Sequence, residues 1–255
     1  MNNIVNYIKN KIVSKPDLAI VLGSGLSGLQ NILNNKIIIQ YTDIPDYFNT
    51  TVKGHEGNFV FGTFKNKYIL IAVGRFHYYE GLSLDEVGLP IKIFNALDCK
   101  NIIITNSSGC LQASWTLGDV MIIDGHYDFT FRNNVQNPRL CKGNNYYNQE
   151  LIDLVLKIDT KVKLGKYGWV LGPTYETKAE IINMRDHGVN AVGMSTIPEV
   201  LMAHKLEINI LVLALMSNYA VGLTTDELTH KKVLENSIKH NQKFKLLLTN
   251  IISEI

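Results

Sequence analysis

The sequence has little of what marks several broad classes of protein. Its 255 residues include three cysteines and six prolines, and Lys plus Arg (25) barely exceed Asp plus Glu (23). An odd cysteine count without CxxC spacing (Cys99, Cys110, Cys141) argues against a disulfide framework and a cysteine metal site. We therefore expect a cytoplasmic protein without a bound metal. The lack of a basic excess argues against a nucleic-acid or membrane-surface partner.

Long apolar runs are also missing. The longest, Ile208 to Met216, contains Asn209 and falls short of the roughly 18 to 20 residues that cross a bilayer. The N-terminus places Ile4 and Ile8 at helical spacing and lacks the order of a secretion signal, so it predicts an amphipathic helix. With 46% apolar residues, the chain can bury a large core, and we expect one domain spanning residues 1–255.

What is present is a series of short, apolar, β-branched runs. They cover residues 18–22, 36–41, 68–73, 101–105, 120–124, 168–171, 190–192 and 208–215. Such continuous runs are typical of strands buried on both faces. Helical patterns lie between them, and their alternation predicts an α/β domain around a mostly parallel sheet.

Start signals and apolar stripes locate some of the helices. Ser83-x-x-Glu86 and Thr196-x-x-Glu199 have the pattern of capping boxes, and a helix is expected at about residues 177–187. The last helix carries an apolar stripe that includes Ile238. The polar stretch 133–148 predicts a loop.

Six motifs follow predicted strands, at residues 23–28, 74–81, 105–109, 172–177, 192–200 and 217–218. The first matches GxGxxG and is followed by Asp43, so it is open to three interpretations: a tight turn, a phosphate-binding loop or a dinucleotide-binding loop. Because the carboxyl ends of parallel strands meet at one edge of the sheet, we expect the six motifs to form one site.

The second motif places Arg75, His77 and Tyr79 on one side of an extended strand end. A guanidinium, an imidazole and a phenol suit an oxyanion with a polyol beside it, although a solvated strand end is the alternative. The other motifs add an aromatic ring, a carboxylate and an amide for a heterocycle. Together these groups indicate a ligand with a phosphate, a sugar and a base.

With these motifs the chain resembles the purine nucleoside phosphorylases of the low-molecular-mass, homotrimeric class. The resemblance implies an α/β fold whose mixed central sheet partly closes into a distorted barrel flanked by helices. It also implies reversible phosphorolysis of purine ribonucleosides and deoxyribonucleosides in purine salvage, with inorganic phosphate as co-substrate and no metal or organic cofactor. The matching segments are Gly23-Ser24-Gly25-Leu26, Lys53-Gly54-His55-Glu56-Gly57, Gly74-Arg75-Phe76-His77-x-Tyr79-Glu80-Gly81, Thr105-Asn106-x-x-Gly109, Gly118-Asp119-Val120, Gly172-Pro173-x-Tyr175-Glu176-Thr177, Val192-Gly193-Met194-Ser195-Thr196-x-Pro198-Glu199 and Ser217-Asn218.

The resemblance also implies a role for each matching residue. The expected phosphate ligands are Ser24, His55, Arg75, His77, Ser195 and the backbone N–H of Ser107. The expected ribose contacts are Tyr79, Met194 and His230. The expected purine contacts are Ser108, Gly109, Tyr175, Glu176, Val192, Gly193 and Asn218. Asn218, Glu176 and His77 are the expected catalytic residues. Ser107 and Ser108 stand where many members of the family have two alanines.

Asn218 bears on the choice of base. A side-chain amide can satisfy N7 and O6 of a 6-oxopurine, whereas a 6-amino group prefers a carboxylate, so we expect inosine and guanosine over adenosine. A methylthioadenosine-type phosphorylase is the near alternative. A Rossmann-type NAD-binding oxidoreductase, based on residues 23–28 and Asp43, and a catalytically silent nucleoside-binding protein are the more distant ones.

Overall fold

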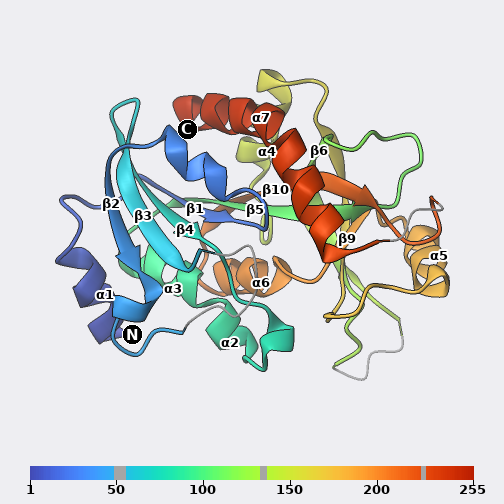
Figure 1. Cartoon of the computed structure of the whole chain (residues 1–255), viewed down its shortest axis with the longest axis horizontal. Helices are drawn as coiled ribbons and strands as arrows, with labels where there is room; N and C mark the ends of the chain where they lie inside the picture. The colour runs from blue at the N-terminus through green and yellow to red at the C-terminus, as the bar shows by residue number, and fades with distance from the viewer. Residues whose placement is uncertain (49–55, 133–136, 225–227) are drawn as a thin grey trace.

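The computed structural model describes residues 1–48, 56–132, 137–224 and 228–255. Within these ranges ten strands form one mixed sheet. Helices α4 (Gln149–Ile158) and α7 (His230–Glu254) lie on one side of it in Figure 1, and α2 (Leu84–Val87), α3 (Leu89–Ala96) and α6 (Ile197–Lys205) lie on the other. The remaining helices are α1 (Asn2–Lys9) and α5 (Lys178–Asp186).

Five strands close into a barrel: β5 (Asn101–Cys110), β6 (Val120–Asp128), β8 (Lys163–Trp169), β9 (Ala191–Gly193) and β10 (Asn209–Tyr219). The pairing of β10 with both β6 and β5 completes the ring. The sheet continues beyond β5 through β1 (Leu18–Leu22), β4 (Lys67–Val73), β3 (Asn58–Phe64) and β2 (Asn34–Gln40). The distorted barrel that the resemblance implies is therefore confirmed.

The expectation of a mostly parallel sheet is wrong, because about half of the strand pairings are antiparallel. β1 runs parallel to its neighbours β4 and β5, but β3 pairs antiparallel with both β2 and β4. β3 was not predicted, and it joins β4 through a two-residue turn. Lys65 and Asn66 in this turn have φ of 47° and 63°, as in the tight hairpin turns that suit twisted strands.

Observed strand bounds agree best with the predicted ones where a polar residue or glycine marks the end of an apolar run. β1 occupies the predicted residues 18–22, whereas β8 ends at Trp169 and makes the prediction of a strand at 168–171 wrong. Three barrel strands, β5, β6 and β10, are longer than expected. Several residues that were predicted to follow a strand therefore lie within its last residues. A short strand, β7 (Leu140–Lys142), pairs with β6 inside the predicted loop 133–148, of which 133–136 lie outside the described residues.

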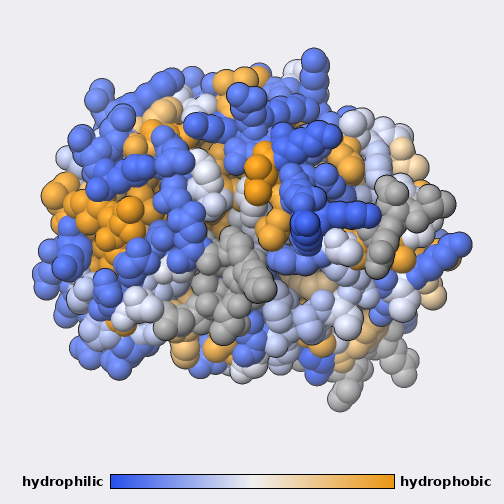
Figure 2. Space-filling model, in the orientation of Figure 1, coloured by the Kyte–Doolittle hydropathy of each residue, from blue (hydrophilic) through white to orange (hydrophobic). Residues whose placement is uncertain are grey.

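Helix signals gave mixed results. The Ser83 capping box is confirmed, since Ser83 Oγ accepts from the Glu86 backbone N–H at 3.3 Å. The prediction that Ile238 lies on the buried stripe of α7 is wrong, because this side chain is 64% exposed. The neighbouring Ser237 is fully buried and belongs to the buried face of the helix. No helix in the described part of the chain is long and apolar enough to span a bilayer. Figure 2 shows a largely hydrophilic face with an apolar area over β2 and β3.

Candidate active site

One cleft of about 100 Å³, open to solvent, gathers the predicted site residues. Its lining includes every predicted residue except His55, which lies outside the described residues, and Ser108. The lining residues are Ser24, Arg75, His77, Tyr79, Asn106, Ser107, Gly109, Tyr175, Glu176, Val192, Gly193, Met194, Ser195, Asn218, His230 and Val233. The six strand-end motifs thus meet at one edge of the sheet, as the sequence predicts.

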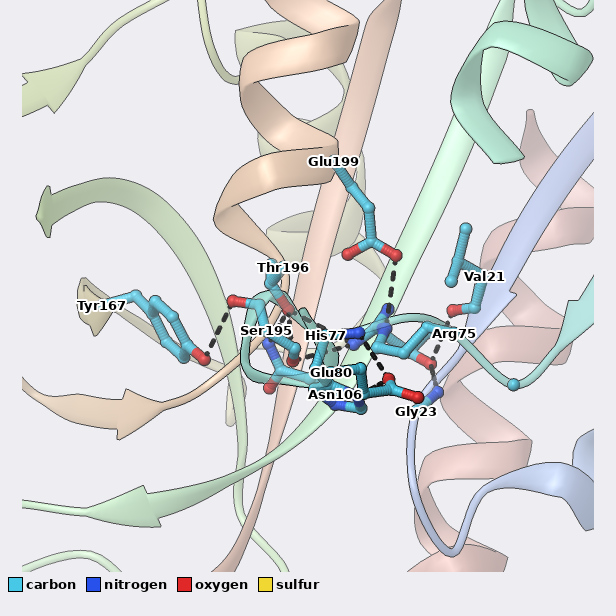
Figure 3. A network of polar contacts seen from close by, with 12 residues as sticks. Val21, Gly23, Arg75, His77, Glu80, Asn106, Tyr167, Ser195, Thr196 and Glu199 are labelled. Atoms are coloured by element: carbon cyan, nitrogen blue, oxygen red, sulfur yellow. Dashed lines mark hydrogen bonds and ion pairs between the residues drawn. The ribbon is translucent and has the colours of Figure 1, made fainter. Parts of the chain in front are cut away.

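Arg75 lines this cleft and is the centre of a buried polar network (Figure 3). Its side chain is 1% exposed, and its Nη1 donates to Ser195 Oγ at 3.2 Å and to Thr196 Oγ1 at 3.3 Å. Its Nε lies 3.3 Å from Glu199 Oε1 in an ion pair. Hydroxyls and a carboxylate therefore hold the guanidinium in one orientation.

The same network overturns the predicted capping box Thr196-x-x-Glu199. Thr196 makes no side-chain bond to the start of α6, because its Oγ1 accepts from Asn106 Nδ2 at 2.7 Å and from Arg75. Glu199 faces Arg75 and is fully buried, which raises the pKa of its carboxyl, while the guanidinium opposes that shift. Thr196 has φ of 78°, a strained conformation for a β-branched residue, and these side-chain bonds hold it there.

Two buried nitrogens of Arg75 make no hydrogen bond within the described residues. Nε is held in the ion pair with Glu199, whereas Nη2 takes part in no ion pair there either. A buried donor without a partner costs about 1–3 kcal/mol, so such groups are rare unless a ligand satisfies them. A guanidinium edge that lines a cleft beside a serine hydroxyl suits an oxyanion such as phosphate.

His77 lies beside Arg75 and is held by Glu80. Its backbone N–H donates to Glu80 Oε1 at 2.7 Å, and its Nδ1 lies 3.2 Å from the same oxygen. Burial lowers the pKa of the imidazole, and Glu80 opposes this shift. The Tyr79 ring stacks on the imidazole, with ring centroids 4.8 Å apart. Tyr79 belongs to the 3-10 helix η3 (Tyr78–Glu80) rather than to an extended strand end, yet all three side chains reach the cleft.

The cleft is also lined by Asn218, Glu176 and Tyr175. Asn218 Oδ1 accepts from Ser217 Oγ at 2.9 Å, and Nδ2 donates to the Tyr219 carbonyl at 3.1 Å, which leaves one amide N–H for a ligand. Burial raises the pKa of the Glu176 carboxyl. No side chain in the described ranges donates a hydrogen bond to this carboxylate, so it can accept from a ligand N–H.

Ser108 does not reach the cleft as predicted. It is 2% exposed, and its hydroxyl donates to Asn106 Oδ1 at 2.7 Å. Asn106 therefore links Ser108 to Thr196, and it lines the cleft itself. The sequence offered a signal for Asn106, since it belongs to the Thr105–Gly109 motif. Val233 was missed because it looks like one more apolar residue of α7.

The glycine-rich turn does not have the structure that the dinucleotide-binding alternative requires. Residues 27–32 after the glycine-rich turn form a 3-10 helix, η1 (Ser27–Ile32), whereas the dinucleotide fingerprint needs an α-helix whose N-terminus meets the pyrophosphate. The oxidoreductase interpretation therefore loses its structural basis. Among the described residues, no group of three or more His, Cys, Asp or Glu is placed to hold a metal ion.

Comparisons with known proteins agree with this geometry. The family model described as "Phosphorylase superfamily" matches residues 17–253. Purine nucleoside phosphorylase 1 of Bacillus subtilis (strain 168) is 34% identical, over 97% of this chain and 96% of that protein. Purine nucleoside phosphorylase 1 of Geobacillus stearothermophilus is 36% identical, over 93% of this chain and 91% of that protein.

Solved structures give the same answer. Schistosoma mansoni purine nucleoside phosphorylase in complex with inosine superimposes with a TM-score of 0.88 and 30% identity, covering 100% of this chain and 95% of that one. The same enzyme in complex with adenosine gives a TM-score of 0.89 at 30% identity, covering 100% and 96%. The fold, the cleft and these relatives together place the chain in the phosphorylase superfamily, among the purine nucleoside phosphorylases.

Proposed function

We propose that this protein catalyses the reversible phosphorolysis of 6-oxopurine ribonucleosides and deoxyribonucleosides, giving free purine and (deoxy)ribose 1-phosphate. The observation that carries the proposal is one cleft lined both by Arg75 with its unpartnered buried Nη2, the proposed phosphate end, and by Glu176 and Asn218, the proposed purine end. Anion-binding and heterocycle-binding groups that line the same cleft suit a nucleoside held beside phosphate.

Phosphate binds at the Arg75 end. The guanidinium, the Ser195 hydroxyl, Ser24 and the Ser107 backbone N–H surround the anion, and His77 lies at its side. An anion next to His77 favours the protonated imidazole and so opposes the effect of burial on its pKa. These groups hold the nucleophile in place beneath C1′ of the ribose, which is contacted by Tyr79, Met194 and His230.

The reaction breaks the N9–C1′ bond and leaves its electron pair on the purine. Positive charge builds on the ribose, and the phosphate dianion offsets it before one phosphate oxygen forms the new bond to C1′. Negative charge builds on the purine. Asn218 stabilises it by donating to N7, and Glu176 anchors the ring by accepting the N1–H. The residues act by position and electrostatics, and phosphate is the only co-substrate.

The orientation of Asn218 favours 6-oxopurines. Because Ser217 donates to its Oδ1, the amide presents an N–H to the base. O6 and N7 of hypoxanthine or guanine accept such a bond, whereas the amino group of adenine needs an acceptor. His230 on the cleft suits a ribose 5′-hydroxyl better than the apolar methylthio group of methylthioadenosine. These two observations favour inosine and guanosine.

The proposal includes a homotrimeric assembly, a cytoplasmic location and a role in purine salvage, all of which rest on the resemblance to the family. Light scattering tests the assembly. We expect about three times the 28.7 kDa mass of one chain, and a mass near 28.7 kDa would contradict it.

Hypoxanthine release from inosine, with and without inorganic phosphate, tests the reaction, with adenosine run in parallel. We expect release from inosine that depends on phosphate, with much less adenine from adenosine. Release without phosphate would indicate a hydrolase. No release under either condition would support the silent nucleoside-binding alternative.

A further inference from the structure

A pair of hydroxyls links helix α7 to the phosphate end of the cleft. Ser237 Oγ lies 2.9 Å from Ser107 Oγ, and Ser107 Oγ donates to the Ser24 backbone carbonyl at 2.8 Å. Ser237 is fully buried, whereas Ser107 and Ser24 line the cleft. Three segments that are far apart in the sequence therefore meet at these two hydroxyls.

The helix packs directly on the loop that follows β1. Gly25 in that loop has φ of 76°, and a Cβ atom at this position would lie 2.5 Å from Ser237 Cβ. A side chain at residue 25 would collide with Ser237, so the loop and the helix approach as closely as their backbones allow. This packing fixes where the Ser237 hydroxyl lies relative to Ser24 and Ser107.

The number of protons on the Ser107 and Ser237 hydroxyls limits which hydrogen bonds the two can make. Each serine hydroxyl has one proton to donate and two lone pairs. Ser237 can donate to Ser107 Oγ or to the Val233 carbonyl, which lies 2.8 Å away. When Ser237 donates to Ser107, the Ser107 proton must turn to another acceptor, which is the Ser24 carbonyl in this structure. A charged phosphate oxygen is a stronger acceptor than a carbonyl, so rotation of the hydroxyl would exchange one for the other.

We infer that the Ser107 hydroxyl is an additional hydrogen-bond donor to the bound phosphate and that Ser237 is a positioning residue that directs the Ser107 proton toward it. The inference rests on the proposed phosphorolysis, because it requires phosphate at the Arg75 end. It goes beyond the backbone N–H of Ser107, since many members of the family have alanine, which lacks a hydroxyl, at this position. It also connects α7, which carries His230 on the cleft, to phosphate binding.

Steady-state kinetics of inosine phosphorolysis test the inference in Ser107→Ala, Ser237→Ala and the double variant. Loss of a hydrogen bond to a charged group raises the phosphate KM about tenfold in Ser107→Ala. Ser237→Ala raises it about threefold, because the donor remains but is less well directed. The inosine KM stays unchanged in both. The phosphate KM of the double variant does not exceed that of Ser107→Ala, since Ser237 acts through Ser107.

The matched control is Ser253→Ala. Ser253 lies on the same helix and donates to the carbonyl four residues earlier, as Ser237 can, but far from the cleft. We expect wild-type kinetics. An unchanged phosphate KM in Ser107→Ala, or independent effects that multiply in the double variant, would overturn the inference while the wild type remains active. A wild type that does not cleave inosine with phosphate would overturn the proposed function itself.

Discussion

The side chains at the phosphate end of the cleft are joined to one another by hydrogen bonds and an ion pair without a ligand, whereas those at the purine end make few such bonds with one another. Arg75, Thr196 and Glu199 are each at most 1% exposed and contact one another directly. Tyr175 and Glu176 are only partly buried, and they come from the segment that joins β8 to α5 rather than from the core.

The difference follows from what each end must bind. A phosphate dianion is small and heavily hydrated, so a site replaces its water best with fixed dipoles and charges that need no reorganisation. A purine is large and flat and supplies its own apolar surface, so its pocket can be completed by the ligand. We therefore expect variants at the phosphate end to affect stability and phosphate binding together, and variants at the purine end to affect base recognition alone.

Arg75→Met gives the largest expected effect. It removes the guanidinium and leaves Glu199 buried without a cation, which costs about 3–5 kcal/mol. We expect kcat/KM for phosphate to fall at least about a thousandfold, as loss of a buried charged contact does. Thermal unfolding measures the stability loss.

The double variant Arg75→Met/Glu199→Gln separates these two effects. Neutralising the stranded carboxyl should recover much of the lost thermal stability without recovering phosphate binding. If Arg75→Met were as stable as the wild type, Glu199 would not depend on Arg75, and the bonded network would be the wrong description of this end.

Asn218→Asp is expected to change base preference with little effect on stability. The carboxylate cannot donate to N7, so kcat/KM for inosine should fall about a hundredfold, the effect of losing one transition-state donor. Adenosine gains an acceptor for its amino group, and its rate relative to inosine should rise. Asn218→Ala is the control, because it should lower both rates. Equal losses for both nucleosides in Asn218→Asp would contradict the role of the amide.

Glu176→Gln tests the purine end through pH. The pKa of Glu176 is raised above its ordinary value of 4.5, so the carboxylate that accepts the N1–H is lost as the pH falls through that raised value. We expect kcat/KM for inosine in the wild type to decline on the acid side above pH 4.5. The variant should have lower activity, by about tenfold or more, and no such acid decline. If the decline persists in the variant, Glu176 is not the group that titrates, and His77 or the phosphate itself is responsible.

Thr196→Val has the smallest expected effect. Valine keeps the shape of threonine but removes the oxygen that accepts from Asn106 and Arg75. We expect a stability loss of about 1–3 kcal/mol and a phosphate KM several-fold higher. Thr196→Ser keeps the hydroxyl and should stay close to the wild type. A valine variant with wild-type stability and phosphate KM, or a serine variant as impaired as the valine variant, would contradict the role assigned to the Thr196 hydroxyl.

The sequence predicts those parts of the fold that depend on strong local signals and on contacts between residues close together in the sequence. β1 was placed to the residue because Asp17 and Gly23 bracket an unbroken apolar run, whereas glycines and lysines within β8 hide its strand character. The capping box at Thr196 was wrong because the threonine hydroxyl accepts from Asn106 and Arg75, which are far away in the sequence. Barrel closure by β10 and β5 is likewise a long-range pairing without a local signal.

The cleft was predicted better than the network beneath it. Strand ends bring Arg75, Ser195 and Asn218 together by topology alone, so motif position was enough. The bonds of Asn106, Ser108 and Ser237 depend on side-chain directions in the folded core, which residue types do not reveal.

Calorimetric titration of the protein with inorganic phosphate, in the absence of any nucleoside, tests the difference between the two ends most directly. A phosphate end that is built in advance should bind phosphate alone, and Arg75→Met should abolish that binding. Binding of phosphate only after a nucleoside is added, or equal binding by wild type and Arg75→Met, would contradict a preformed anion site.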